Sequence, residues 1–188
     1  MRQSMSLYAF SLSKRLALTA AFAALCFIGT IVIVIPMPFG FFNLGDVFVL
    51  LSGWCLGPLY GGVAAAVGSS LADVVAGFPL YVPATFFIKG LDAVLGYFVW
   101  FALKTVIHGE KLDVLPRAIS ALAGETFMAF GYFSYECLLY GVGGAMAALW
   151  GNVMQGLFGM VLATALVVCL SSIKSIRKLF PLLKKKKD

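Results

Sequence analysis

The chain has 188 residues and a formal net charge of +6, with 62% hydrophobic and only 12% charged residues. Soluble proteins hold roughly 45–50% apolar and about 25% charged residues, so a soluble domain of this length could not bury so much apolar surface. The composition excludes an ordinary cytosolic enzyme, a disordered chain and a disulfide scaffold. It predicts a multi-pass membrane protein with a single domain over residues 1–188.

Six apolar segments have the character of helices that cross a bilayer, which takes about 20 residues per span. Pro36 ends the first segment, the turn 57–61 divides the second from the third, and Pro83 opens the fourth. We therefore predict an all-α membrane protein with helices at 16–35, 45–56, 62–76, 83–105, 117–139 and 144–170, and a basic tail at 171–188.

Basic residues predict the orientation of these helices. Of the 14 Lys and Arg residues, most precede the first helix, separate the fourth from the fifth or follow the sixth: Arg2, Lys14, Arg15, Lys104, Lys111, Arg117, Lys174, Arg177, Lys178 and the lysine run 184–187. With six spans these segments share one side, and the positive-inside rule makes that side, with both termini, cytoplasmic. We expect the lysine run to contact anionic lipid headgroups rather than nucleic acid. We also expect the first helix to be retained rather than cleaved as a signal peptide.

The cysteines and the histidine indicate no metal site, no cofactor and no catalytic residue. Cys26, Cys55, Cys137 and Cys169 lie in apolar runs without a CxxC pair, and His108 stands alone. Isolated cysteines of this kind usually behave as small buried hydrophobic residues.

Polar side chains gather in the predicted outer half of the membrane, where a charge is costly and marks a polar interior or a binding site. Aromatic rings alternate with them, which favours a small, polar, ring-containing ligand. The candidate binding residues are Asn43, Asp46, Asp73, Tyr81, Lys89, Tyr132, Glu136, Trp150, Asn152 and Gln155. One lysine among five intramembrane carboxylates favours a neutral or cationic ligand.

A structural role is the alternative for some of these groups. Lys89 and Asp92 are three residues apart and could pair within one helix. Asp46 could cap the start of the second helix, and a structural role is as consistent with Asp92 and Glu125 as ligand binding is. A proton relay fits less well, because a relay crosses the membrane and these residues lie on one side.

Small residues four apart form ridges that allow close helix packing. On the third helix we expect such a ridge to pack inside the bundle: Ala64, Gly68, Ala72 and Ala76. On the first helix two overlapping pairs could pack inside or serve a partner protein: Ala17 with Ala21, and Ala20 with Ala24.

Six short motifs carry a resemblance to a known family: NLGD at 43–46, LGPLYG at 56–61, SSLAD at 69–73, YVPAT at 81–85, IKG at 88–90 and GNVMQG at 151–156. In this order and spacing the chain resembles the substrate-binding S component of an energy-coupling-factor (ECF) vitamin transporter, in the riboflavin-transporter-like branch that includes hydroxymethylpyrimidine and pyridoxine importers. The resemblance covers nearly the whole chain, from about 16 to 170.

The resemblance implies six helices, an extracytoplasmic pocket under the first, third and fifth loops, and no catalysis. It also implies a transmembrane coupling subunit, docked on the alanine motif of the first helix, and two ATPase subunits. The chain has no GxxxxGK[ST] sequence, in keeping with ATP hydrolysis on separate subunits.

We therefore expect a binding subunit in the plasma membrane of a prokaryote that captures a water-soluble vitamin or precursor. Hydroxymethylpyrimidine or pyridoxine ranks first and pantothenate lower. One alternative is a stand-alone secondary permease, whose sequence would be expected to contain an internal repeat. The other is a membrane-embedded enzyme, which would need a catalytic set such as HExxH.

Overall fold

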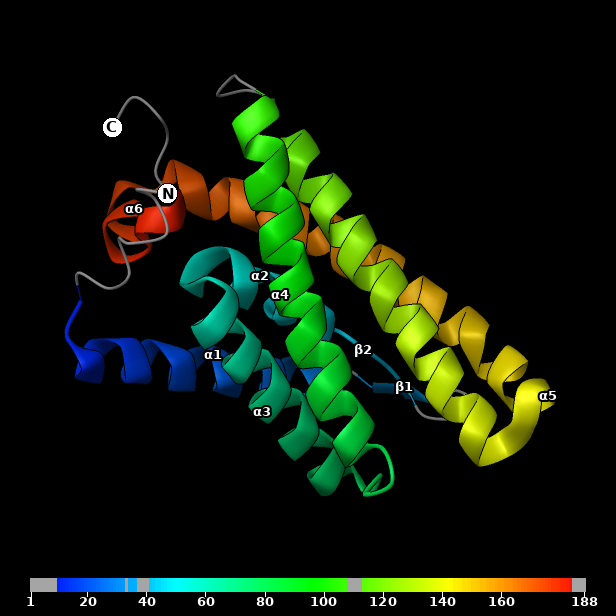
Figure 1. Ribbon diagram of the computed structural model, residues 1–188. Coiled ribbons are helices and arrows are strands. Elements are labelled where there is room, and N and C mark those ends of the chain that lie inside the picture. Colours follow the sequence, from blue (N-terminus) through cyan, green and yellow to red (C-terminus); the bar gives the residue numbers. More distant parts are fainter. Residues whose placement is uncertain (1–9, 33, 37–40, 108–112, 184–188) are drawn as a thin grey trace.

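Figure 1 shows the computed structural model, a bundle of helices in which residues 10–32, 34–36, 41–107 and 113–183 are described. Its elements are α1 (Leu12–Val32), β1 (Val34–Pro36), β2 (Phe41–Asn43), α2 (Gly45–Leu56), α3 (Pro58–Ala76), α4 (Val82–Val106), α5 (Val114–Ser172), α6 (Lys174–Leu179) and a 3-10 helix (Pro181–Leu183). Within the described residues α1, α3, α4 and α5 are long and apolar enough to cross a membrane, and α2 is a shorter apolar helix. These helices fit a multi-pass membrane protein.

The helix α5 has 59 residues and reverses direction at Gly141, so it forms two antiparallel limbs at 114–140 and 142–172 (Figure 1). Gly141 has φ 72° and ψ 173°, a backbone conformation that glycine adopts without steric cost. The limbs correspond to the fifth and sixth predicted helices. That six segments cross the bilayer with both termini in the cytoplasm stays a prediction. Arg2, His108, Lys111 and the lysine run 184–187 lie outside the described residues.

The predicted C-terminal end of the first helix, at residue 35, is wrong. The helix stops at Val32, and Val34–Pro36 instead pairs with Phe41–Asn43 as a short antiparallel hairpin with Ile35 opposite Phe42. Pro36 explains the change, because a proline restricts the residue before it to extended backbone and cannot donate to a helical ladder. The hairpin brings Asn43 to the polar end of the bundle.

The turn predicted at 57–61 is shorter than expected. Gly57 alone separates α2 from α3, with φ 82°, and Pro58 already occupies the first turn of α3. A proline is well placed there because the first helical N–H groups have no partner within the helix. The third helix therefore begins four residues earlier than the predicted Gly62.

The segment after α5 is more than the basic tail that we predicted for 171–188. α6 and the following 3-10 helix fold back on the bundle, and Phe180, Leu182 and Leu183 are buried in its core. The Phe180 ring packs edge-on against Phe22 of α1, with 5.7 Å between the ring centroids. This segment covers the end of the molecule opposite the α3–α4 turn and the reversal of α5 (Figure 1).

The small-residue ridges face in two directions. On α3, Ala64, Gly68 and Ala72 are buried as predicted, whereas Ala76 is exposed. On α1 all four predicted docking positions are exposed: Ala17, Ala20, Ala21 and Ala24. The opposite face of α1 is the one that packs on the bundle.

The cysteines differ in exposure. Cys26 and Cys55 are buried, as predicted, whereas Cys137 is half-buried and Cys169 is exposed.

Candidate functional site

A polar cavity of about 50 Å³ lies at the end of the bundle that carries the hairpin and the α3–α4 turn. Side chains from α1, β2, α3, the α3–α4 turn, α4 and both limbs of α5 contribute to it. It is lined by Thr30, Asn43, Ser69, Asp73, Phe78, Tyr81, Thr85, Lys89, Tyr132, Glu136, Asn152 and Gln155. Charged, amide, hydroxyl and aromatic groups thus meet from segments that are far apart in the sequence.

The predicted binding residues line this cavity with two exceptions, Asp46 and Trp150. Asp46 lies behind the wall, fully buried, and contacts two of the lining side chains. Trp150 is 68% exposed on the outer surface of α5. The structure therefore keeps Asp46 next to the cavity and separates Trp150 from it.

Four lining residues were absent from the prediction: Thr30, Ser69, Phe78 and Thr85. Helical spacing could have identified two of them. Ser69 precedes Asp73 by four residues and Thr85 precedes Lys89 by four, and residues four apart share one face of a helix.

A chain of hydrogen bonds forms the inner wall of the cavity. Gln155 Oε1 accepts from Asn43 N at 3.0 Å and from Asn43 Nδ2 at 3.1 Å, and Gln155 Nε2 donates to Asp46 Oδ2 at 2.7 Å. The other carboxylate oxygen of Asp46 accepts from Lys89 Nζ in a buried ion pair. This network joins β2, α2, α4 and the second limb of α5.

The network decides between the roles that the sequence left open. Lys89 pairs with Asp46 of another helix, so the intrahelical Lys89–Asp92 pair is not formed. Asp46 makes no capping bond at the start of α2, where Asn43 Oδ1 instead accepts from Gly45 N at 2.8 Å. Both Asp46 and Lys89 are therefore held by tertiary contacts.

The opposite wall is aromatic and carries a second carboxylate. Glu136 accepts long hydrogen bonds from Tyr81 Oη and from Asn152 Nδ2, both at 3.4 Å. Tyr132 Oη and Thr85 Oγ1 lie 2.9 Å apart and share a hydrogen bond. Bonds as long as those of Glu136 leave its oxygens able to accept better-placed donors.

Two buried polar atoms on the cavity wall have no hydrogen-bond partner within the described residues, Asp73 Oδ2 and Ser69 Oγ. Lys89 is the basic side chain among the lining residues, and its charge is compensated by Asp46. The cavity is therefore acidic, with carboxylates at Asp73 and Glu136. A buried polar group without a partner costs free energy, which a ligand that donates a hydrogen bond can recover.

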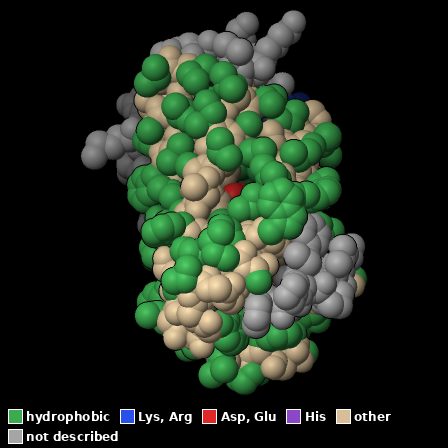
Figure 2. Space-filling model, turned by 90° about the vertical axis from the view of Figure 1, so that its right-hand side faces the viewer, with side chains coloured by type: hydrophobic (Ala, Val, Ile, Leu, Met, Phe, Trp, Pro, Cys, Tyr) green, Lys and Arg blue, Asp and Glu red, His purple; other side chains and the backbone are tan. Residues whose placement is uncertain are grey.

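Two larger hollows lie on the outer surface and are lined mostly by apolar side chains, with Glu125 in the first of them. One, of about 390 Å³, lies between the limbs of α5, and the other, of about 440 Å³, lies between α3 and α4. Figure 2 shows the face formed largely by α5, where hydrophobic side chains surround a recess with an acidic group at its bottom. Such apolar surfaces suit lipid chains better than a polar ligand, so the small polar cavity is the candidate binding site.

Comparison with known proteins identifies the family of the chain. A sequence model of the family described as "ECF-type riboflavin transporter, S component" matches residues 11–172. An uncharacterised protein of Pyrococcus woesei is 35% identical over 139 residues, covering 73% of this chain and 88% of its own length. The "Thiamine precursor transporter HmpT" of Lactococcus lactis subsp. cremoris (strain MG1363) is 30% identical over 160 residues, covering 81% of this chain and 85% of its own. The chain belongs to the S component family of ECF-type transporters, which are transport subunits and not enzymes.

Proposed function

We propose that this protein is the substrate-binding subunit of an ATP-driven ECF importer. It captures a water-soluble vitamin or vitamin precursor at the extracytoplasmic face and delivers it through a coupling subunit that two ATPase subunits drive. Membership of the S component family supports this function. The Lactococcus relative named as a thiamine precursor transporter supports a precursor as cargo.

The observation that carries the choice of ligand is the unpaired oxygen of Asp73 beside the unpaired hydroxyl of Ser69. Both face a cavity in which Glu136 adds a second carboxylate and the Lys89 charge is already compensated. These groups accept hydrogen bonds from amino or hydroxyl groups and disfavour an anion. Hydroxymethylpyrimidine or pyridoxine is therefore the first choice, and pantothenate, which carries a carboxylate, ranks lower.

The ring of such a ligand would stack on the aromatic wall. Tyr81 lies at the centre of this wall, with its ring centroid 6.2 Å from Phe78, 6.3 Å from Tyr132 and 6.0 Å from Tyr135. Aromatic rings at these separations offer faces and edges to a planar heterocycle. Glu136 and Asn152, at the end of the wall, would fix its orientation.

A cavity of about 50 Å³ holds a few water molecules and must widen for a ring to enter. The α3–α4 turn is the part best placed to move, because it carries Phe78 and Tyr81 over the cavity. Gly77, which ends α3 with φ 82°, provides a backbone position without a side chain at the start of this turn. Ligand entry would thus displace Phe78 and Tyr81 together.

The outward alanines of α1 are the proposed docking surface for the coupling subunit: Ala17, Ala20, Ala21 and Ala24. Side chains this small allow a partner helix to approach closely. The face is free in the described chain because Phe22, Cys26 and Gly29 make the contacts with the bundle.

Native mass spectrometry of the purified chain, followed by calorimetric titration with hydroxymethylpyrimidine, pyridoxine, pantothenate, thiamine and riboflavin, tests this proposal. We expect one of these compounds to bind tightly with a stoichiometry of one. Uptake into proteoliposomes should then need the coupling and ATPase subunits. Uptake by the chain alone would favour a stand-alone permease, and the absence of binding across the panel would contradict the proposed cargo.

A further inference from the structure

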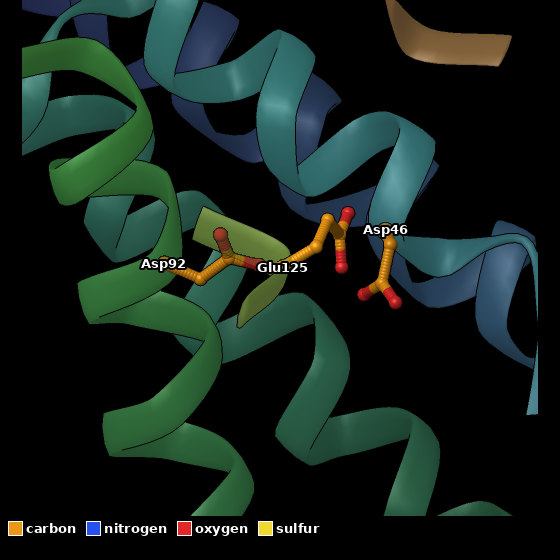
Figure 3. Close-up of side chains that lie close together, drawn as sticks. All are labelled: Asp46, Asp92 and Glu125. Carbon is orange, nitrogen blue, oxygen red and sulfur yellow. The ribbon is translucent and has the colours of Figure 1, made fainter. Parts of the chain in front are cut away.

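Three carboxylates from three helices meet behind the cavity, at Asp46 of α2, Asp92 of α4 and Glu125 of α5 (Figure 3). One oxygen from each lies within 4.8 Å of the others. All three residues are buried, with exposed fractions of 0%, 0% and 5%. Acidic side chains rarely share a buried site unless something compensates their charge.

The partners of these oxygens differ. Both oxygens of Asp46 are occupied, one by Lys89 and one by Gln155. In contrast, both oxygens of Asp92 and both oxygens of Glu125 are buried without any hydrogen-bond partner in the described part of the chain. Four buried carboxylate oxygens therefore lack a hydrogen-bond partner among the described residues, which is costly for a charged group.

Glycines on α5 shape the space around these oxygens. A Cβ atom at Gly156 would lie 3.2 Å from Glu125 Oε2, and one at Gly159 would lie 2.8 Å from Glu125 Oε1. A Cβ atom at Gly124 would likewise collide with Asp92 Oδ1. The α5 backbone thus approaches the carboxylates closely at these glycines, and Glu125 also borders the hollow between the limbs of α5, through which a small species could reach it.

We propose that Asp46, Asp92 and Glu125 bind a divalent cation, with Ca²⁺ as the best fit. Lys89 balances one of the three negative charges when all are ionised, which leaves two for the cation. The donors are all carboxylate oxygens, which hard cations prefer. Three oxygens that lie within 4.8 Å of one another can surround one point at about 2.8 Å or less, a range that includes the Ca²⁺–oxygen distance of about 2.3–2.6 Å. Mg²⁺ needs shorter distances and usually keeps several waters.

The cysteine and histidine pattern could not have indicated this site, because its donors are carboxylates 33 or more residues apart in the sequence. Its position gives it a further consequence. Lys89 and Gln155 both line the cavity and both bind Asp46. These two side chains therefore connect the site of the transported ligand to the site of the cation. By linkage each should change the affinity of the other. This second consequence rests on the proposed function, whereas cation binding does not.

The test is direct on the purified full-length chain in detergent. The protein is stripped with EGTA, dialysed against Ca²⁺ at constant ionic strength, and the bound metal is counted by elemental mass spectrometry. We expect one Ca²⁺ per chain. We also expect a saturable rise of roughly 5–10 °C in the unfolding temperature at 100 times the Kd, and a smaller rise with Mg²⁺ or Na⁺.

Variants localise the effect. Asp92→Asn and Glu125→Gln remove negative charge while keeping the shape of the side chains, and each should abolish Ca²⁺ binding and the thermal shift. Because each also removes a buried charge, the unfolding temperature without Ca²⁺ should stay the same or rise, which separates loss of binding from misfolding. The matched control is Glu136→Gln, a carboxylate change in the cavity that leaves the three ligands intact and should preserve the Ca²⁺ shift.

The outcomes that overturn the proposal are specific. The absence of bound Ca²⁺ would do so, and so would bound Ca²⁺ that survives both triad substitutions. If lowering the pH stabilises the protein while no metal is bound, the proposal would also fail. The carboxylates would then be neutralised by protons instead of a cation. If Ca²⁺ binds but no vitamin does, the cation site stands and the proposed function fails.

Discussion

Lys89 of α4 and Asp46 of α2 form a buried ion pair 43 residues apart in the sequence, with side chains that are 5% and 1% exposed. Lys89 lines the candidate cavity and Asp46 lies behind it. Lys89 Nζ also lies 5.4 Å from the centroid of the Tyr132 ring. The ammonium group therefore interacts with both Asp46 and Tyr132. At the cavity it offers a hydrogen-bond donor whose positive charge is already compensated.

Breaking this pair from either side should destabilise the fold. Lys89→Met leaves Asp46 buried without its cation, and Asp46→Asn leaves Lys89 without its anion. Loss of one partner of a buried pair typically costs about 3–5 kcal/mol. The double variant should recover much of this loss, because it removes both members of the pair and leaves neither of them charged without the other. Thermal unfolding of the four proteins as a double-mutant cycle measures the coupling, and additive single effects would show that the two charges do not interact.

Glu136→Gln should weaken binding of the transported ligand. The carboxylate accepts from Tyr81 and Asn152 only at 3.4 Å, so it can reorganise around a ligand donor at little cost. A hydrogen bond to a charged group contributes about 1.5–3 kcal/mol, which corresponds to a loss of roughly 10- to 150-fold in affinity. Titration calorimetry with the ligand found by mass spectrometry provides the measurement. Unchanged affinity in both Glu136→Gln and Asn152→Ala would place the site elsewhere.

Trp150→Ala should leave that affinity unchanged. The side chain is 68% exposed on the outer surface, and Tyr132, which lines the cavity, is 8% exposed. Tyr132→Ala is the matched comparison and should reduce affinity at least about tenfold, because it removes an aromatic wall and its bond to Thr85. Equal losses in both variants would mean that Trp150 turns into the cavity when the ligand binds.

The contrast between Trp150 and Asn152 shows what periodicity alone can resolve. Side chains two residues apart on a helix, such as Trp150 and Asn152, point in nearly opposite directions. Asn152 and Gln155 are three residues apart and share a face. The helical wheel therefore groups Asn152 with Gln155 and excludes Trp150. The sequence prediction chose by residue type and proximity, and the structure separates the three as the periodicity requires.

The partner of Lys89 could not be predicted in the same way. Asp92 is its neighbour on α4, but the structure joins Lys89 to Asp46 because α2 packs against α4 at this level. The many lysines likewise made the segment after α5 read as a basic tail. In the structure Phe180, Leu182 and Leu183 are buried, and Ile176 and Leu179 are partly buried against them. Apolar segment length located the helices well, whereas contacts between distant helices depend on packing that no single segment encodes.

Bulky substitutions on the outer face of α1 should block transport without affecting ligand binding. Ala20→Trp or Ala24→Trp places a large ring where a partner helix would need close approach. Uptake of labelled ligand by the assembled transporter should fall at least about tenfold, with an unchanged Kd for the isolated chain. Leu71→Trp, at an exposed position on α3, is the control and should transport normally. Normal uptake by both alanine variants would move the docking surface off this face.

Asp113, just before α5, binds a buried arginine at the end of the bundle away from the candidate cavity. Its Oδ2 accepts from Arg117 Nε at 3.0 Å and its Oδ1 from Trp100 Nε1 at 3.3 Å, while Lys104 Nζ lies 3.9 Å away. The Arg117 guanidinium lies over two indoles, with its Cζ 4.5 Å from the Trp100 centroid and 5.3 Å from that of Trp54. Asp113→Asn should therefore cost about 1–3 kcal/mol, because the buried guanidinium loses its anion.

The pH dependence of this loss checks the electrostatic cause. Although burial raises the pKa of Asp113, the charges of Arg117 and Lys104 and the two hydrogen bonds outweigh it and hold the pKa below its ordinary value. A carboxyl group with a lowered pKa stabilises the fold above about pH 4, its unfolded pKa, and this contribution is lost as the pH falls through the folded value. The difference in unfolding temperature between wild type and Asp113→Asn should thus be constant from pH 7 to about pH 5 and shrink at lower pH. A difference that persists unchanged at acidic pH would mean that shape, rather than charge, makes Asp113 matter.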